Sequence, residues 1–423
     1  MSTASAASAA SAARTPSAGW KQPIGNAVVA LVLLLLALGV PGTTTVFRLS
    51  SASAAVALPD IALPAQATLV VLAAVCAALA AVGAIAIRRG SAPPAWAAIV
   101  AAVSAVLGFL TWAAAGATLP VVGLLGGSLA LAVPLIFGSL AGVVSERVGV
   151  VNVAIEGQLL AGAFCSALLA SVTGEPLVGL VAAAVAGMLV SLVLAVFAIR
   201  YLVDQVIVGI VLNVLVTGLT GFFYTQVLAP ASAQLNSPPR LGRVAIPVLS
   251  DIPVIGPVLF HQTVIVYLMY IGVAAVAYGL YRTRWGLRLR SVGEHPRAAE
   301  TVGIDVSRTR YLNVALAGLI AGVGGAFFTL GNVGAFNKEM TAGAGFIALA
   351  AVIFGRWNPL RAAAAGLLFG FVSNLQNTLS VIGSPVPSEF LLMAPYAVTI
   401  IAVAGFVGRS RGPAAAGKVY ERT

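Results

Sequence analysis

The chain has 423 residues, of which 60% are hydrophobic and 8% are charged, and its mean hydropathy is +1.04. A soluble domain carries about 25% charged residues, so this chain has too few polar side chains to cover a globular surface. The composition excludes a water-soluble enzyme, a nucleic-acid-binding protein and a disordered protein, and it predicts an integral membrane protein. The net charge of +11 then indicates basic loops between membrane spans rather than contact with nucleic acid.

Twelve apolar segments approach the roughly 20 residues that a helix needs to cross a bilayer. The candidate spans are 24–40, 66–87, 95–115, 121–144, 157–172, 176–199, 206–228, 262–281, 311–330, 342–355, 362–382 and 389–408. The first is read as a retained anchor rather than a signal peptide, because no small-residue cleavage site follows it directly. Gly, Asn and Glu interrupt the stretches 146–176 and 331–361, which is typical of half-helices or re-entrant loops.

These segments predict an all-α fold, a polytopic transmembrane helix bundle of about 10–12 spans. Residues 1–22 are an Ala/Ser-rich tail, expected to be disordered and cytoplasmic. Residues 23–120 are peripheral N-terminal helices, residues 121–410 are the core, and residues 411–423 are a basic cytoplasmic tail. Small-residue pairs in the core let helix backbones approach closely; they are Gly123/Gly127, Gly138/Gly142, Gly318/Gly322 and Gly366/Gly370.

The basic residues predict the orientation. With the N-terminus in the cytoplasm, 19 of the 23 Lys and Arg residues fall in inner connections, and the outer connections hold only Arg48, Arg240, Arg243 and Lys338. Cytoplasmic loops carry such an excess of positive charge. We therefore expect a multi-pass protein of the inner (plasma) membrane, in contact with lipid and with both termini in the cytoplasm.

The ionisable residues disfavour catalysis and ion coupling. His261 and His295 are predicted on opposite membrane faces, and neither Cys76 nor Cys165 has the company of a metal site, so no metal is expected. Glu156 is the only acid that could lie within the membrane; it is either a helix N-terminal carboxylate or, less favourably, a proton relay. The segment 412–419 resembles a phosphate-binding loop, but Val419 replaces the required Ser or Thr. The chain is expected to bind no nucleotide or other cofactor.

Polar groups concentrate in the later spans. An unpaired amide in hydrocarbon costs several kcal/mol, so these groups must face one another or a wet cavity. They are either interhelical hydrogen bonds or, as a set, a pathway for a neutral, hydroxyl-rich solute. The candidate path residues are Asn152, Glu156, Gln158, Asn213, Asn313, Asn374, Gln376 and Asn377, with Thr217, Thr220, Asn332 and Ser373 nearby.

The segment 282–310 holds seven arginines and a short helix signal. Pro296 is suited to a first helical turn and Gly303 to its end, and Ala298, Ala299 and Val302 could form a small apolar face. So short a helix is unstable alone, which favours docking into a protein partner over a basic loop beside anionic lipid.

Three segments carry a family resemblance: SERVGVVNVAIEGQLLAG at 145–162, GLRLRSVGEHPRAAETVGID at 286–305 and GRWNPLRAAAAGLLFG at 355–370. In this order they resemble ABC-importer permeases of the branched-chain amino acid and simple-sugar group, in its nucleoside-type branch. The resemblance implies a coupling helix seated on a cytoplasmic ATPase, with the residues Glu294, Pro296, Ala298, Ala299, Glu300 and Gly303. It also implies that the ATPase binds ATP, that a second homologous permease shares the path, and that an extracytoplasmic lipoprotein delivers the solute.

The resemblance favours nucleosides as the solute, moved by alternating access. A simple-sugar permease is the alternative, because the two branches share helices and coupling loop. An ion-coupled carrier or channel is disfavoured by the lack of intramembrane acids. A membrane enzyme would need a cluster of His, Asp or Glu on one face, and the sequence offers none.

Overall fold

The computed structural model describes residues 19–50, 57–384, 386–387, 389–390, 393, 397 and 412–421. The chain forms two compact units. Unit 1 comprises residues 1–49, 58–121 and 378–387, and unit 2 comprises residues 50–57, 122–377 and 388–423. Most of the predicted tail 1–22 and nearly all of the predicted span 389–408 lie outside the described residues.

Unit 1 is a helical hairpin with a third helix beside it. Its helices are α1 (Lys21–Leu38), α2 (Ala65–Arg88) and α3 (Ala95–Ala113), and its strands are β1 (Thr44–Arg48), β2 (Ile61–Pro64) and β3 (Thr118–Pro120). Strand β1 pairs antiparallel with β2 and parallel with β3. Leu33, Leu69 and Cys76 are buried between the helices, while the remaining faces stay apolar and exposed, as expected of helices surrounded by lipid.

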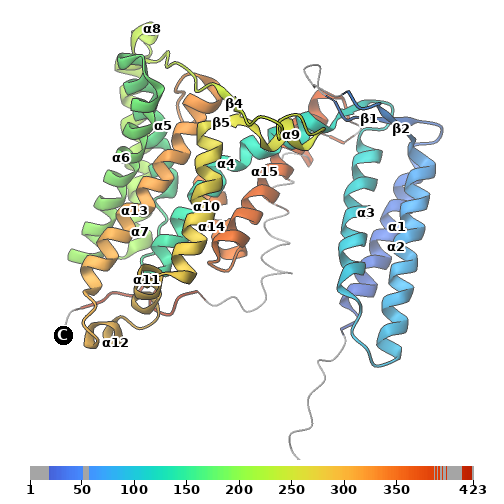
Figure 1. The fold of residues 1–423 in the computed structure, drawn as a ribbon, viewed down its shortest axis with the longest axis horizontal. Coiled ribbons are helices and arrows are strands. Elements are labelled where there is room, and N and C mark those ends of the chain that lie inside the picture. The colour runs from blue at the N-terminus through green and yellow to red at the C-terminus, as the bar shows by residue number, and fades with distance from the viewer. Residues whose placement is uncertain are drawn as a thin grey trace, which may run out of the picture. The chain divides into compact units, whose positions relative to one another are not determined.

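Unit 2 contains the core helices. They are α4 (Val121–Arg147), α5 (Ile155–Thr173), α6 (Pro176–Ala195), α7 (Gln205–Phe223), α10 (Val264–Arg282), α11 (Arg284–Glu294), α12 (Pro296–Thr301), α13 (Val306–Ala326), α14 (Ala344–Phe354) and α15 (Pro359–Val381). Helices α6, α7 and α13 continue into π-helical turns at Val196–Arg200, Tyr224–Leu228 and Phe327–Val333. The short elements α8 (Ser232–Leu235), β4 (Arg243–Ala245), α9 (Ile255–Leu259) and β5 (His261–Thr263) lie at the end of unit 2 opposite α11 and α12 (Figure 1).

Among the described residues, nine helices are long and apolar enough to cross a membrane, which confirms the predicted all-α polytopic bundle. Eleven of the twelve candidate spans coincide with a helix. The interruption predicted within 331–361 is also confirmed, since irregular backbone from 334 to 343 leads into the 11-residue α14. Within 146–176 the break is confined to residues 148–154, after which α5 runs for 19 residues without interruption.

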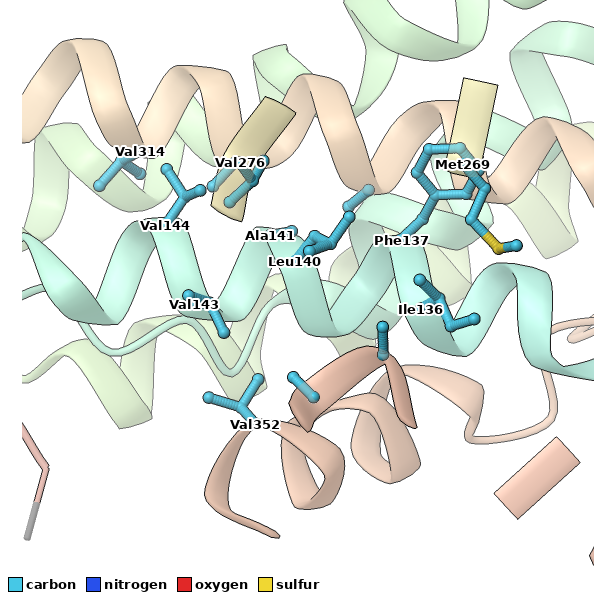
Figure 2. Close-up of a cluster of buried hydrophobic side chains, with 14 of the residues drawn as sticks. Ile136, Phe137, Leu140, Ala141, Val143, Val144, Met269, Val276, Val314 and Val352 are labelled. Carbon is cyan, nitrogen blue, oxygen red and sulfur yellow. The ribbon is translucent and has the colours of Figure 1, made fainter. Parts of the chain in front are cut away.

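Helix α4 is the centre of unit 2, since every residue from Ala132 to Glu146 is buried. Figure 2 shows its side chains between two groups of neighbours. Met269 and Val276 of α10 and Val314 of α13 lie on one side, and Val352 of α14 lies on the other. A helix that is apolar all round is expected at such a position.

Glycines bring three core helices into backbone contact. A Cβ on Gly162 of α5 would clash with the carbonyl of Gly322 in α13, and a Cβ on Gly322 would clash with the carbonyl of Ala183 in α6. A Cβ on Gly187 of α6 would likewise clash with the carbonyl of Gly318 in α13. The predicted Gly318/Gly322 pair is therefore a site of close helix approach.

We expect Gly322→Leu to destabilise the folded protein by about 1–3 kcal/mol or more, because the side chain has no space and both neighbours are backbone. Thermal unfolding of the purified protein in detergent measures this. Gly218→Leu on α7 is the matched control, because nothing lies within 4 Å of a Cβ there. Equal melting temperatures for the two variants would contradict the close crossing.

Candidate functional site

The structure places Glu156 deep in unit 2, at the start of α5 and beside the middle of α7. Its neighbour Gly157 donates its backbone N–H to Oδ1 of Asn213 at 2.8 Å. Asn213 lies eight residues into α7, about 12 Å along the helix axis. Residues 148–154 therefore carry the chain from the end of α4 to this depth, which is the re-entrant path that the sequence pattern indicates.

The Glu156 carboxylate holds the start of α14. Oε1 accepts the Thr341 hydroxyl at 2.6 Å and the Gly343 backbone N–H at 2.9 Å, and Oε2 accepts the Gly345 N–H at 2.6 Å. These N–H groups belong to the first turn of a helix and have no partner within it, and the positive end of the helix dipole also favours a carboxylate here. Glu156 thus caps a second helix, in addition to standing in the first turn of its own.

An open cavity of roughly 540 Å³ lies beside these hydrogen bonds between Glu156 and the start of α14. Polar groups on its wall come from Glu156, Asn213, Thr217, Glu339 and Thr341. Its apolar wall includes Leu160, Val214 and Phe346, whose ring is half-exposed. Small-molecule sites have volumes of about 300–1,000 Å³ and combine an apolar wall with a few polar groups, so this cavity has the size and lining of a small-molecule site.

Only two of the predicted path residues, Glu156 and Asn213, line this cavity. Asn213 also donates to the Val153 carbonyl at 2.9 Å, so both ends of its amide hold the re-entrant segment. Asn152 and Gln158 are fully buried and bond to each other in both directions, at 3.1 and 3.0 Å. The amides of these two satisfy each other rather than facing the cavity.

The remaining predicted path residues lie elsewhere in unit 2. Asn313 accepts the Trp285 indole N–H at 2.9 Å, close to α11. Asn374 on α15 donates to the Leu124 carbonyl at 2.7 Å. Gln376 is half-buried and Asn377 is exposed on the same helix. The structure does not gather these four with Glu156, and their part in a path stays a prediction.

Three further residues of the cavity lining, Glu339, Thr341 and Phe346, were not among the predicted path residues. Thr341 stands about 185 residues from Glu156, so no local spacing could pair them. The available signal was the glycine-rich stretch 341–345 in front of an apolar run. Gly345 permits the close approach, because a Cβ there would clash with the backbone of Glu156.

The predicted coupling helix is present as α12, with Pro296 in its first turn and Gly303 at a φ of +83° after its end. Ala299 is buried in the core of unit 2, whereas Ala298 is exposed and Val302 is 75% exposed. The three side chains therefore do not form one apolar face, since Ala299 attaches the helix to its own protein. Glu294 accepts the Ala414 N–H at 3.2 Å, and Glu300 accepts the Tyr420 hydroxyl.

The three motif segments meet near α12. Glu146 of the first accepts the indole N–H of Trp357 from the third at 2.6 Å, and Arg147 donates to the Trp357 carbonyl at 3.0 Å. A Cβ on Gly293 of the second would clash with the Arg147 carbonyl. His261 in β5 and His295 after α11 lie at opposite ends of unit 2 (Figure 1). Among the described residues, no three His, Cys, Asp or Glu side chains gather as a metal site.

The family described as "Branched-chain amino acid transport system / permease component" matches residues 124–403, which include the three motifs and α12. The chain belongs to this permease family. The permease is 40% identical over 306 residues to a guanosine ABC transporter permease protein of Bacillus subtilis, covering 69% of this chain and 94% of that one. It is 43% identical over 300 residues to a nucleoside ABC transporter permease protein of Lactococcus lactis, covering 68% and 93%.

A putative glucose ABC transporter permease protein of Haloferax volcanii is 36% identical over 257 residues, covering 60% of this chain and 77% of that one. No solved structure matches the permease. Membership confirms the resemblance drawn from the motifs. The permease is a multi-pass membrane protein and the transport subunit of an ABC transporter, not an enzyme, and it works with an ATPase and a substrate-binding protein.

We expect Glu156→Ala to lower the melting temperature of the purified permease and to abolish transport, because it leaves a hydroxyl and two buried N–H groups without an acceptor. Each hydrogen bond to a charged group contributes about 1.5–3 kcal/mol. Thr341→Val, which removes one of the three, should cost less. Glu175→Ala is the control, because this residue is exposed and, although it stands at the N-cap position of α6, its side chain makes no capping hydrogen bond. A Glu156→Ala variant as stable as Glu175→Ala would contradict the role of Glu156 in capping α14.

Proposed function

We propose that the permease imports nucleosides, with a second homologous permease completing the path and an extracytoplasmic lipoprotein delivering the solute. The observation that carries the proposal is the cavity beside Glu156, which is lined both by hydrogen-bonding groups and by an aromatic ring. Thr217, Thr341 and Glu339 can bond ribose hydroxyls or base edges, and Phe346 can stack on a planar base. The two nucleoside-type relatives support the same solute class.

Alternating access in this proposal is driven from α12. The exposed Ala298 and Val302 would contact the ATPase, while the buried Ala299 carries the motion into the core. ATP would be bound by the ATPase subunit alone. The sequence of segment 412–419 supports this division, because Val419 stands where a phosphate-binding loop needs Ser or Thr.

The solute assignment is tested by uptake in cells that express the complete transporter. We expect labelled nucleosides to accumulate, unlabelled nucleosides to compete and glucose to have no effect. Phe346→Leu should raise the KM roughly tenfold, since stacking on a base contributes about 1–3 kcal/mol. Phe222→Leu is the control, an exposed aromatic on α7 outside the cavity. Uptake of glucose without nucleosides would favour the sugar alternative, for which the glucose permease relative is the supporting observation.

The orientation is tested with single cysteines in a background carrying Cys76→Ala and Cys165→Ala. Val248→Cys, in the loop at the α9 end of unit 2, should react with an impermeant maleimide in intact cells. Val302→Cys should react only after the membrane is opened. Both positions are more than 70% exposed, so access rather than burial decides the result. The reverse pattern would contradict cytoplasmic placement of α12.

A further inference from the structure

The C-terminal residues 412–421 pack against the segments that carry α12. The backbone N–H of Ala415 donates to the Gly293 carbonyl at 2.9 Å, and the neighbouring Ala414 N–H donates to Glu294. Ala415 is 5% exposed. A Cβ on Gly412 would lie 2.9 Å from the Trp357 ring, which places this end of the segment beside the third motif. Figure 1 shows the C-terminal end of the chain close to α12.

Tyr420 joins α12 to the start of α13. Its hydroxyl donates to Oε2 of Glu300, and its ring faces the guanidinium of Arg310, whose central carbon is 5.6 Å from the ring centroid. Arg310 is 2% exposed, and its Nε and one terminal nitrogen have no hydrogen-bond partner among the described residues. A buried cation is costly unless other groups stabilise its charge. An aromatic face within about 6 Å attracts a cation, and the Tyr420 ring supplies one here. Tyr420 is thus held between an acid of α12 and a cation of α13.

The same segment widens the exposed surface around α12. A cavity of roughly 520 Å³ is lined by Arg297 and Ala298 of α12 and by Lys418 and Val419 of the C-terminal segment. Val419 is 50% exposed and Val302 is 75% exposed. Neither lies in a helix long enough to span the membrane, so lipid tails do not account for these exposed apolar side chains.

We propose that residues 412–421 are part of the coupling apparatus: Tyr420 positions α12 through Glu300, and the segment forms with α12 one docking surface for the ATPase subunit. This inference rests on the proposed function of α12. Continuity of the surface with α12, across the cavity between them, identifies the occupant.

The docking surface is tested by cysteine protection in the assembled transporter, in the background lacking Cys76 and Cys165. We expect the ATPase subunit to slow maleimide labelling of both Val302→Cys and Val419→Cys about tenfold or more, relative to permease stripped of ATPase. Val248→Cys, at the opposite end of unit 2, should label at the same rate in both states. Protection of Val302→Cys without Val419→Cys would overturn this inference and leave the proposed function standing. Protection of neither would overturn both.

The positioning role is tested with Tyr420→Phe, Glu300→Gln and the double variant, scored by ATPase co-purification and by the ratio of ATP hydrolysed to solute imported. Tyr420→Phe removes the hydrogen bond and keeps the ring over Arg310. We expect each single variant to weaken ATPase binding about tenfold, and the double variant to be no worse than either, because both remove one interaction. The melting temperature of the permease alone should not move.

Tyr201→Phe is the matched control, because Tyr201 is 66% exposed and its hydroxyl has no hydrogen-bond partner among the described residues. Additive effects in the double variant would overturn the role of Tyr420 through Glu300. So would wild-type coupling in both Tyr420→Phe and Tyr420→Ala.

Discussion

The first backbone N–H groups of a helix have no hydrogen-bond partner within that helix, and inside a membrane each of them needs another acceptor. In this permease the Glu156 carboxylate supplies the missing acceptors for α14. The other end of α14 leads to Trp357, which Glu146 and Arg147 hold in place. Both ends of the half-helix are therefore fixed by side chains of the first motif. The cavity beside Glu156 and the meeting of the three motifs both depend on this arrangement.

Two kinds of contact thus connect the cavity beside Glu156 to the end of unit 2 that carries α12. Apolar packing runs through α4, which is buried on every side and touches α10, α13 and α14 (Figure 2). Polar contacts join α4 to Trp357, and a close approach of the Gly293 and Arg147 backbones brings α4 against the residues just before α12. In the proposed mechanism, these contacts would pass a displacement of α12 to the central helix.

The sequence was a good guide wherever the signal was local. The lengths of the apolar segments predicted the helices, and Pro296 and Gly303 predicted the two ends of α12. The polar and glycine interruptions in 331–361 predicted the half-helix α14. Contacts between distant residues carried no such signal. Glu156 bonds to Thr341, which lies about 185 positions away in the sequence, and Tyr420 bonds to Glu300, which lies 120 positions away. Composition also could not separate Asn152 and Gln158, which satisfy each other, from Asn213, which borders the cavity.

The glycine contacts among α5, α6 and α13 have a mechanical consequence. Where backbones touch, no side chain can change rotamer to let one helix slide along another. These three helices are thus constrained to travel as a single rigid block. The irregular segments 148–154 and 334–343 adjoin the two ends of this block in the sequence, so the proposed change in which side of the membrane the cavity faces would bend the chain there rather than within the block.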